Sequence, residues 1–232
     1  LSSNTSSAGP SYATAELTWA LILAAARQLP AQVASLRAGT WQAGVGDTVR
    51  GKTLGVFGFG KLGRVVAGYG RAFGMSVLVW GSERSRAAAA QEGHAVAATA
   101  REFFAAADVV SLHLRLTAQT RGLVSAADLA AMKPTAILVN TSRAGLIEPG
   151  ALAAALRAGR PGRAAVDVFD VEPLTDPDDD LLTAPGLIAT PHIGFVTRED
   201  FDTQFTDVFD QVNAFAAGAP IHMVNPEVGQ RG

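Results

Sequence analysis

Three short segments of the sequence carry side chains that together could transfer a proton beside a bound anion. They are NTSRAG (140–145), DVFDVEP (167–173) and TPHIG (190–194), and each comes at the end of an apolar run typical of a buried strand. The carboxyl ends of parallel strands share one edge of a sheet, so Arg143, Glu172 and His192 are expected to meet there. Such a set suits the reduction of a 2-keto acid, which needs a cation for the carboxylate and a proton donor for the carbonyl oxygen.

The predicted roles differ among the three side chains. Arg143 grips a substrate carboxylate through two parallel hydrogen bonds and polarises the neighbouring carbonyl. His192 gives a proton in reduction and takes it back in oxidation, while Glu172 fixes the ring's tautomer and keeps it charged. Taken singly, each has a plainer interpretation as a loop, surface or turn residue. Their common position at strand ends of one chain favours the chemical interpretation.

A glycine-rich loop indicates what else binds at this edge. Gly58-Phe59-Gly60-Lys61-Leu62-Gly63 matches G-x-G-x-x-G between an apolar run and a helical stretch. Gly58 permits the tight turn, Gly60 lets the backbone approach a pyrophosphate, and Gly63 lets the helix pack closely on the strand. The start of that helix, at Lys61 and Leu62, supplies amide donors. In this context the pattern favours dinucleotide binding over an ordinary structural turn.

The choice between NAD and NADP depends on the end of the next strand. The acidic residue that holds a ribose 2′-hydroxyl is expected eighteen residues after Gly63, where this chain has Gly81. Without that carboxylate there is room for a 2′-phosphate, which Ser82, Arg84 and Arg86 could bind. Alternatively, the arginines are solvated charges at a helix start and Glu83 takes the acidic role. The missing acid favours NADP, and NAD stays open.

Strand-like and helical stretches alternate along the chain and determine where these residues can lie. Helical composition is found at 12–29, ended by Pro30, then from the glycine loop to about 73, and at 101–107, 125–132, 149–159 and 198–217. A short helix followed by a loop is predicted for 31–50. Strand-like runs lie at 52–60, 75–80, 108–114, 135–140, 164–169 and 187–190. This order predicts an α/β fold, a doubly wound parallel sheet of the Rossmann type with helices on both faces.

The composition excludes several classes of function. Because the chain has no cysteine, it has no disulfide, thiolate metal site or cysteine nucleophile. A net charge of −2 offers no electrostatic footprint for nucleic acid or an anionic membrane, so anion binding has to be local. The apolar stretch 19–26 is far shorter than the roughly 20 residues that span a bilayer, and no signal pattern opens the sequence. A cytoplasmic protein is therefore predicted.

With these segments identified, the chain closely resembles the D-isomer-specific 2-hydroxyacid dehydrogenases. The resemblance rests on AELTWALILAAARQLP, VFGFGKLGRVVA, SLHLRLTAQTRGLV, LVNTSRAGLIEPGALAAAL, AAVDVFDVEP and ATPHIGFVT, which run almost end to end. It implies hydride transfer between NAD(P)H and the C2 carbon of a small 2-keto or D-2-hydroxy acid, with Arg143, Glu172 and His192 as the catalytic set. It places Thr141 and Asp167 among the cofactor contacts, with Asp167 at the nicotinamide carboxamide.

The resemblance also implies a larger assembly. Members pair as homodimers through their nucleotide-binding domains, and the helix around Trp19 is a candidate contact, with core packing as the other interpretation. Members also carry an N-terminal substrate domain, and this chain is expected to begin near that domain's end. The predicted division is a linker at 1–11, a dinucleotide-binding domain at 12–212 and a tail at 213–232 that returns toward the substrate domain.

Two departures and two alternatives accompany the resemblance. Gly81 replaces the acid of NAD-using members, and Arg115 stands where many members have proline, so a local turn is expected to differ. One alternative is a nucleotide-sensing corepressor of the same fold, since relatives with that role keep the same three residues. The other is a formate-type dehydrogenase, which ranks low because that branch has glutamine where Glu172 stands.

Overall fold

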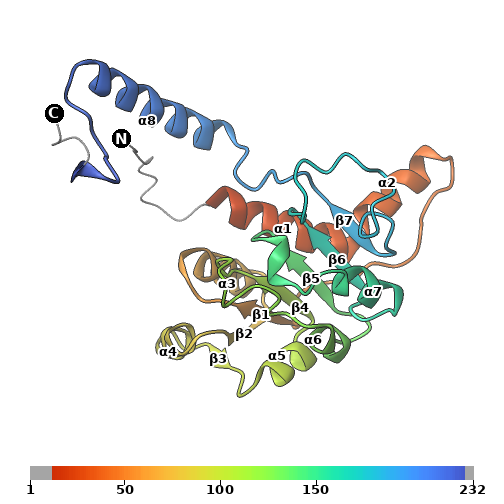
Figure 1. Cartoon of the computed structure of the whole chain (residues 1–232). Coiled ribbons are helices and arrows are strands. Elements are labelled where there is room, and N and C mark those ends of the chain that lie inside the picture. Colours follow the sequence, from red (N-terminus) through yellow and green to blue (C-terminus); the bar gives the residue numbers. More distant parts are fainter. Residues whose placement is uncertain (1–11, 228–232) are drawn as a thin grey trace.

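The computed structural model describes residues 12–227 as a seven-stranded parallel sheet with helices on both faces (Figure 1). The predicted linker at 1–11 and the last five residues of the predicted tail lie outside the described residues. The strands are β1 (Thr53–Phe57), β2 (Ser76–Trp80), β3 (Ala95–Val96), β4 (Val109–Leu112), β5 (Ile137–Asn140), β6 (Arg163–Val166) and β7 (Leu187–Ala189). The helices are α1 (Tyr12–Arg27), α2 (Leu29–Arg37), α3 (Lys61–Ala72), α4 (Glu83–Gln91), α5 (Ala100–Ala106), α6 (Ala126–Ala131), α7 (Ala151–Arg157) and α8 (Arg198–Ala216), with a 3₁₀ turn η1 at Ala144–Leu146.

The strand order confirms the predicted doubly wound sheet. The order is β3-β2-β1-β4-β5-β6-β7, and all neighbours are parallel. The winding direction reverses between β1 and β4, which pair from Leu54 opposite Val109 to Phe57 opposite Leu112. Ligands bind at the carboxyl ends of the strands beside such a reversal. The glycine loop follows β1 directly, so the fold places it at this point.

Each face of the sheet is covered by its own helices and has its own core. On one face α1 and α3 pack with Ile22 and Val66 over the sheet, and on the other α5, α6 and α7 contribute Phe103 and Leu129. All four residues of β4 and all four of β5 are buried, because a parallel sheet covered on both faces has no solvent-facing side. Packing on both faces holds the strands in place and so fixes the positions of the strand ends that carry the site.

Two parts of the backbone differ from the prediction. The sequence predicts that Pro30 ends the first helix, but α1 already ends at Arg27, and Gln28 takes a left-handed conformation with φ of 54°. Pro30 lies in the first turn of α2, where a missing amide hydrogen costs nothing. The other difference is at 81–97, where no element is predicted and the structure has α4 and β3. The alanine-rich α4 lacks a strong apolar period, and β3 pairs through two residues only.

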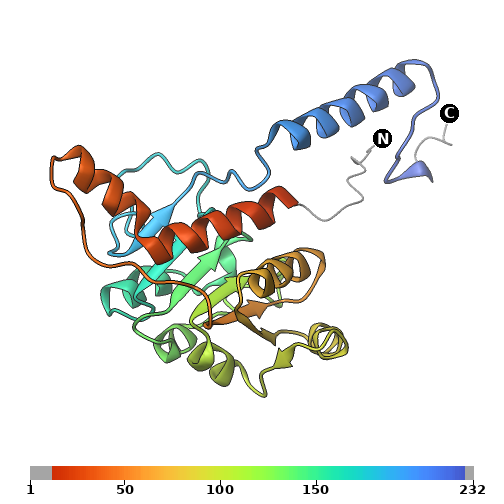
Figure 2. The ribbon, with the colours of Figure 1, turned by 180° about the vertical axis from the view of Figure 1, so that it is seen from behind.

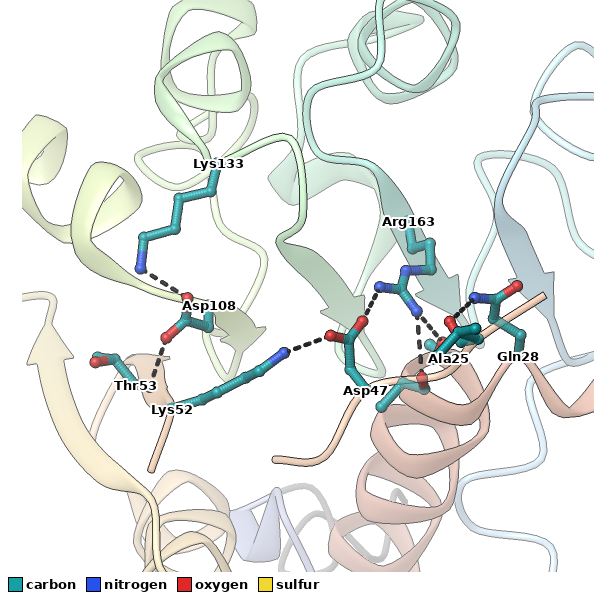
Figure 3. Close-up of polar contacts among 10 residues, drawn as sticks. Ala25, Gln28, Asp47, Lys52, Thr53, Asp108, Lys133 and Arg163 are labelled. Atoms are coloured by element: carbon teal, nitrogen blue, oxygen red, sulfur yellow. Dashed lines mark hydrogen bonds and ion pairs between the residues drawn. The ribbon is translucent and has the colours of Figure 1, made fainter. Parts of the chain in front are cut away.

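Charged side chains link the edge of the sheet opposite the glycine loop, where the strands begin (Figure 3). Asp47, in the loop before β1, pairs with Lys52 at 3.0 Å and with Arg163 at the start of β6. Arg163 also donates to the carbonyl of Ala25 at 2.9 Å, near the end of α1. The hydrogen bonds from Arg163 and Lys52 lower the pKa of Asp47. These contacts join α1, the loop before β1, and β6 at one edge.

A second link at this edge is centred on Asp108, just before β4. Its Oδ1 accepts from Lys133 Nζ at 2.7 Å, and its Oδ2 accepts from the Thr53 amide at 2.8 Å. Burial opposes the charge of Asp108, but Lys133 and the Thr53 amide outweigh it, so the pKa of Asp108 is lowered. Asp108 therefore holds the starts of β1 and β4 together while it is ionised.

Replacing Asp108 with alanine should lower the free energy of unfolding at neutral pH by about 1–2 kcal/mol, since it leaves the Thr53 amide and the Lys133 ammonium without their acceptor. The pKa of Asp108 is lower in the folded protein, so its stabilisation is complete above the unfolded value of about 3.9 and is lost as the pH falls below it. In denaturant titrations, the difference in free energy of unfolding between the wild type and Asp108→Ala should shrink as the pH falls from the unfolded pKa of about 3.9 through the lowered pKa of the folded protein. As a control, Asp178→Ala removes an exposed carboxylate and should change the free energy of unfolding little. If Asp108→Ala were as stable as the wild type at neutral pH, the role assigned to Asp108 would be wrong.

Two elements extend from the body of the domain (Figures 1 and 2). Helix α8 extends far from the sheet, and its apolar side chains are exposed, with Phe205 at 54%, Phe209 at 63% and Phe215 at 60%. Helix α2 has no buried residue, and Trp41 in the loop after it is 76% exposed. Among residues 12–227 no helix is both long and apolar enough to cross a membrane. Both surfaces therefore leave apolar side chains uncovered by the domain's own layers.

Candidate active site

The glycine loop has the shape that a dinucleotide pyrophosphate requires. A Cβ on Gly58, whose φ is 97°, would lie 2.5 Å from the carbonyl oxygen of His113, and a Cβ on Gly63 would lie 2.1 Å from that of Gly58. These two glycines are therefore needed for packing inside the protein. A Cβ on Gly60 would meet no atom within 4 Å, so the space in front of it is open. Gly60 is also the N-cap of α3 and offers no side chain to the first-turn amides, which leaves the positive end of the helix to a ligand.

A cleft of about 770 Å³ runs from this loop across the carboxyl ends of β4, β5, β6 and β7. Its walls include five of the residues predicted from the sequence, namely Leu62, Thr141, Arg143, Asp167 and His192. They come from three strand ends and from the first turn of α3, as the doubly wound topology requires. The structure thus brings the predicted proton donor, the predicted anion-binding cation and the dinucleotide loop to one cavity.

The segment after β5 is held in place from inside the protein. Asn140 accepts from the Ser142 amide at 3.0 Å and donates to the Arg143 carbonyl at 2.9 Å, so its side chain closes the turn. The Ser142 hydroxyl donates to the carbonyl of Leu112 at 2.6 Å, which ties the turn to β4. Arg143 is exposed, and its Nη1 donates to the Ser142 carbonyl at 2.6 Å. The backbone that carries Arg143 is therefore held in place, and most of the N–H donors of its guanidinium remain available to a ligand.

His192 and Glu172 form the predicted pair. Nδ1 of His192 lies 2.6 Å from Oε2 of Glu172, and the other carboxylate oxygen accepts from the Phe169 amide at 2.9 Å. Burial opposes the charge of Glu172, but the Phe169 amide, His192 and Arg143 outweigh it, so the pKa of Glu172 is lowered. An ionised carboxylate at Nδ1 places a hydrogen there and leaves Nε2 for the cleft. His192 has a left-handed backbone with φ of 54°, an uncommon conformation for a residue other than glycine, which Gln28 and His222 also adopt outside the cleft.

Asp167 has a role that the sequence did not indicate. It is 1% exposed, and its carboxylate accepts three hydrogen bonds from the segment around His192. The donors are the Thr190 hydroxyl at 2.6 Å and the amides of Ile193 at 2.9 Å and Gly194 at 2.8 Å. Asp167 therefore holds the His192 loop onto the end of β6. It also lines the cleft, so the predicted contact with a nicotinamide carboxamide stays a prediction alongside this positioning role.

Two threonines of α1 attach that helix to the loops that carry Arg143 and His192. The Thr14 hydroxyl donates to the Gly194 carbonyl at 2.9 Å, two residues beyond His192. Thr18 is fully buried, and its hydroxyl donates to the Thr14 carbonyl at 2.8 Å. Because that bond uses its only hydrogen, Thr18 accepts from the Thr141 hydroxyl, 2.8 Å away. Helix α1 thereby fixes the relative positions of the loops that carry Arg143 and His192.

The end of β2 adjoins the other side of the glycine loop, since the Gly58 amide donates to the Trp80 carbonyl at 2.8 Å. Gly81 has φ of 148°, and a Cβ there would lie 3.4 Å from the Gly58 amide nitrogen, so a side chain at this position would be strained. The Ser82 hydroxyl accepts from the Ser85 amide at 3.3 Å and caps α4. Arg84 is exposed, and Arg86 stacks on the Trp80 ring at 4.9 Å.

Several residues of the cleft were not among the predicted site residues. Thr14, Leu114 and Phe195 also line it, and the ring of Phe195 packs edge-on against that of His192, 5.6 Å away. Arg115, noted in the sequence only as a departure, lines the same cleft. Thr14 and Phe195 carry no recognisable motif, because their contribution depends on contacts between distant parts of the chain.

Comparison with known proteins identifies the family. The family model described as D-isomer specific 2-hydroxyacid dehydrogenase, NAD binding domain, matches residues 19–194. A glyoxylate reductase of Aeropyrum pernix is 40% identical over 226 residues, covering 93% of this chain and 67% of the relative. A D-3-phosphoglycerate dehydrogenase of Mycobacterium tuberculosis is 41% identical over 209 residues, covering 89% of this chain and 39% of the relative.

The solved structures agree with the sequence comparison. A crystal structure of an oxidoreductase from Ralstonia solanacearum shares 46% identity with a TM-score of 0.92, covering 97% of this chain and 69% of that one. A glyoxylate reductase from Paecilomyes thermophila shares 32% identity with a TM-score of 0.77, covering 97% of this chain and 68% of that one. The chain spans at most about two thirds of the length of these relatives. Its matched residues include the glycine loop and the strand ends described above, and the chain belongs to the D-isomer-specific 2-hydroxyacid dehydrogenases, of which it carries the NAD-binding domain.

Proposed function

We propose that the protein reduces a small 2-keto acid to a D-2-hydroxy acid, and catalyses the reverse oxidation, with a nicotinamide dinucleotide as the hydride carrier. The observation that carries this proposal is the pair of His192 Nδ1 and Glu172 Oε2, 2.6 Å apart, beside a cleft shared with Arg143 and the glycine loop. The names of the relatives, glyoxylate reductase and D-3-phosphoglycerate dehydrogenase, support the same class of substrate.

The residues divide the chemistry between them. The nicotinamide, when bound, supplies or accepts the hydride at the C2 carbon of the acid. Arg143 holds the carboxylate of the acid and draws electron density toward the carbonyl oxygen. His192 gives the proton of Nε2 to that oxygen as the C2–H bond forms, and takes it back in the oxidation. Glu172 stabilises the charged imidazole before the transfer, and Asp167 keeps the His192 loop in register.

The proposal is tested with the complete protein by following oxidation of NADPH and NADH with glyoxylate, pyruvate, hydroxypyruvate and 2-oxoglutarate. We expect turnover of at least one of these acids and a D-configured product. A complete protein that binds the cofactor and turns over none of a broad series of 2-keto acids would contradict the proposal. That result would instead favour a nucleotide-sensing protein of the same fold.

We further propose that NADP(H) is the preferred cofactor. The end of β2 offers no carboxylate at Gly81, whose backbone conformation disfavours any side chain, and the start of α4 presents Ser82, Arg84 and Arg86. The Nε of Arg86 is buried without a hydrogen-bond partner among the described residues. A 2′-phosphate at the first turn of α4 would supply that partner and would also be favoured by the helix dipole.

Replacing Arg84 with glutamine should weaken NADPH binding by about tenfold or more and leave NADH binding unchanged, because only NADPH carries the phosphate that the arginine binds. Calorimetric titration of the 232-residue chain measures both affinities. Arg101→Gln, an exposed arginine on α5, is the matched control and should alter neither. A wild-type preference for NADH of tenfold or more would contradict the NADP assignment.

We propose that the protein forms a homodimer through the surface of α2 and the loop after it. The sequence named the helix around Trp19 as a candidate contact, with core packing as the other interpretation. The Trp19 side chain itself packs in the core, since it is 4% exposed, stacks on Phe73 and donates to the Val66 carbonyl. The exposed side chains on this surface are apolar instead, with Leu36 at 59%, Trp41 at 76% and Val45 exposed at 89%. Trp41→Arg should shift the mass measured by light scattering from dimer toward monomer; an unchanged dimer would contradict this interface.

The predicted domain division remains a proposal. The boundary proposed at 212 falls inside α8, which continues as one helix to Ala216. The exposed phenylalanines of α8 support a role as an arm that packs on a substrate domain in the whole protein. A cytoplasmic location, predicted from the sequence, also stays a proposal.

A further inference from the structure

The cleft holds more positive charge than one keto acid carboxylate requires. Two arginines, Arg115 and Arg143, line it together with His192. Within residues 12–227 neither arginine forms an ion pair with a carboxylate. The one carboxylate in the lining, Asp167, already accepts three hydrogen bonds from the His192 loop. In the proposed reaction the keto acid carboxylate pairs with Arg143, whereas Arg115 has no anionic partner in the described part of the chain.

Contacts on both sides of Arg115 fix the position of its backbone. Its neighbours Leu114 and Leu116 are half-buried and pack against the core below β4. The Arg115 carbonyl accepts from the Thr120 hydroxyl at 2.6 Å, and that same hydroxyl oxygen accepts from the Thr117 amide at 2.8 Å. The backbone of the segment is therefore held in place, and the exposed side chain of Arg115 lines the cleft from it.

We propose that Arg115 binds a second anionic group, a carboxylate or phosphate at the far end of the substrate. It would so select 2-keto acids with two anionic groups, termed dianionic acids, over monoanionic ones with the carboxylate alone. This inference rests on the proposed function and names its substrate class. An arginine recognises both groups because its donors match a pair of anionic oxygens. The cofactor pyrophosphate is a second source of the same oxygens, since Leu62 of the glycine loop lines the cleft as well. We assign Arg115 to the substrate because the open space at Gly60 and the N-terminus of α3 already serve the pyrophosphate.

The test compares 2-oxoglutarate and 3-phosphohydroxypyruvate with 2-oxobutyrate and pyruvate on the complete protein. The wild type should have the higher kcat/KM for one of the dianionic acids. Arg115→Gln should lower kcat/KM for that acid by roughly 10- to 100-fold, as expected for a lost charge-assisted hydrogen bond. The same variant should change kcat/KM for the monoanionic acids by less than about threefold. Arg115→Lys should lie between, because it keeps the charge and loses the planar fork. Arg121→Gln, on the same loop but outside the cleft lining, should leave kcat/KM for all four acids unchanged.

Each contrary outcome has its own meaning. Equal losses for all acids, or a weaker affinity for NADPH measured by calorimetry, would overturn the inference and assign Arg115 to the cofactor phosphates. A wild type that turns over monoanionic acids with no preference for dianionic ones would overturn it as well, while the proposed function stands. Titration of 2-oxoglutarate and 2-oxobutyrate into the cofactor-loaded protein gives the same comparison without turnover. Equal affinities of the wild type for the two acids there would overturn the inference even if the proposed function had failed.

Discussion

Replacing His192 with asparagine in the complete enzyme should lower kcat by about 10²- to 10⁴-fold, the usual contribution of a general acid–base group. The His192 imidazole lines the cleft and can donate a proton into it, and the carboxylate of Glu172 lies 2.6 Å from its other ring nitrogen, Nδ1. Asparagine suits the position because His192 has φ of 54°, a left-handed conformation that asparagine adopts more readily than most residues. The fold and the cofactor affinity should therefore survive, and steady-state kinetics beside a calorimetric titration of NADPH measure both quantities.

A matched control is available in the same chain. His222 has φ of 52° and is exposed, and it lies outside the cleft lining. His222→Asn should therefore leave kcat within about twofold of the wild type, an ordinary surface effect. A His192→Asn enzyme that keeps more than half of the wild-type kcat would remove His192 from the proton transfer.

Replacing Arg143 with alanine should lower kcat/KM by about 10²- to 10⁴-fold, with a higher KM and a lower kcat together. Both change because the guanidinium has two tasks, holding the carboxylate in the ground state and polarising the carbonyl as the transition state forms. The turn beneath it should remain intact, since Asn140 and Ser142 hold the backbone through bonds that the Arg143 side chain does not make. Steady-state kinetics on the best 2-keto acid separate the two parameters.

Arg143→Lys distinguishes charge from geometry. Lysine keeps the charge and loses the planar, two-pronged geometry of the guanidinium. Compared with Arg143→Ala, it should bring KM part of the way back to the wild-type value and restore less of kcat. Arg101→Ala, an exposed arginine on α5, should change neither parameter. If Arg143→Ala weakened only cofactor binding and left KM for the acid unchanged, Arg143 would belong to the cofactor site instead.

The parts of the site that the sequence predicted are the parts that local patterns encode. The glycine loop is contiguous and follows an apolar run, so Gly58, Gly60 and Gly63 could be assigned their roles in order. Arg143 and His192 follow strands whose parallel pairing forces their carboxyl ends to one edge, so topology alone predicts that they meet. The structure confirms that both line one cleft and that Glu172 hydrogen-bonds His192.

The parts that the sequence did not predict depend on contacts across long stretches of chain. Thr14 and Gly194 are 180 residues apart and Thr18 and Thr141 are 123 apart, and nothing in a threonine's neighbours indicates such a partner. Asp167 was expected at the nicotinamide from the family resemblance, while its three bonds to the His192 loop depend on how that loop folds back. Pro30 was expected to end a helix and starts one, since proline is compatible with both places and only the left-handed Gln28 decides between them.

The central claim, that this cleft transfers a hydride between a nicotinamide and C2 of a 2-keto acid, is tested most directly with a labelled cofactor. The complete protein is supplied with NADPH or NADH carrying deuterium at the transferred C4 position, together with the keto acid that it turns over best. Mass spectrometry and chiral separation of the product should find one deuterium on C2 of the D-2-hydroxy acid, and about a hundredfold less labelled product or lower when His192→Asn is used over the same interval. A protein that binds the labelled cofactor but yields no deuterated hydroxy acid from any 2-keto acid, or places the label elsewhere, would contradict the account.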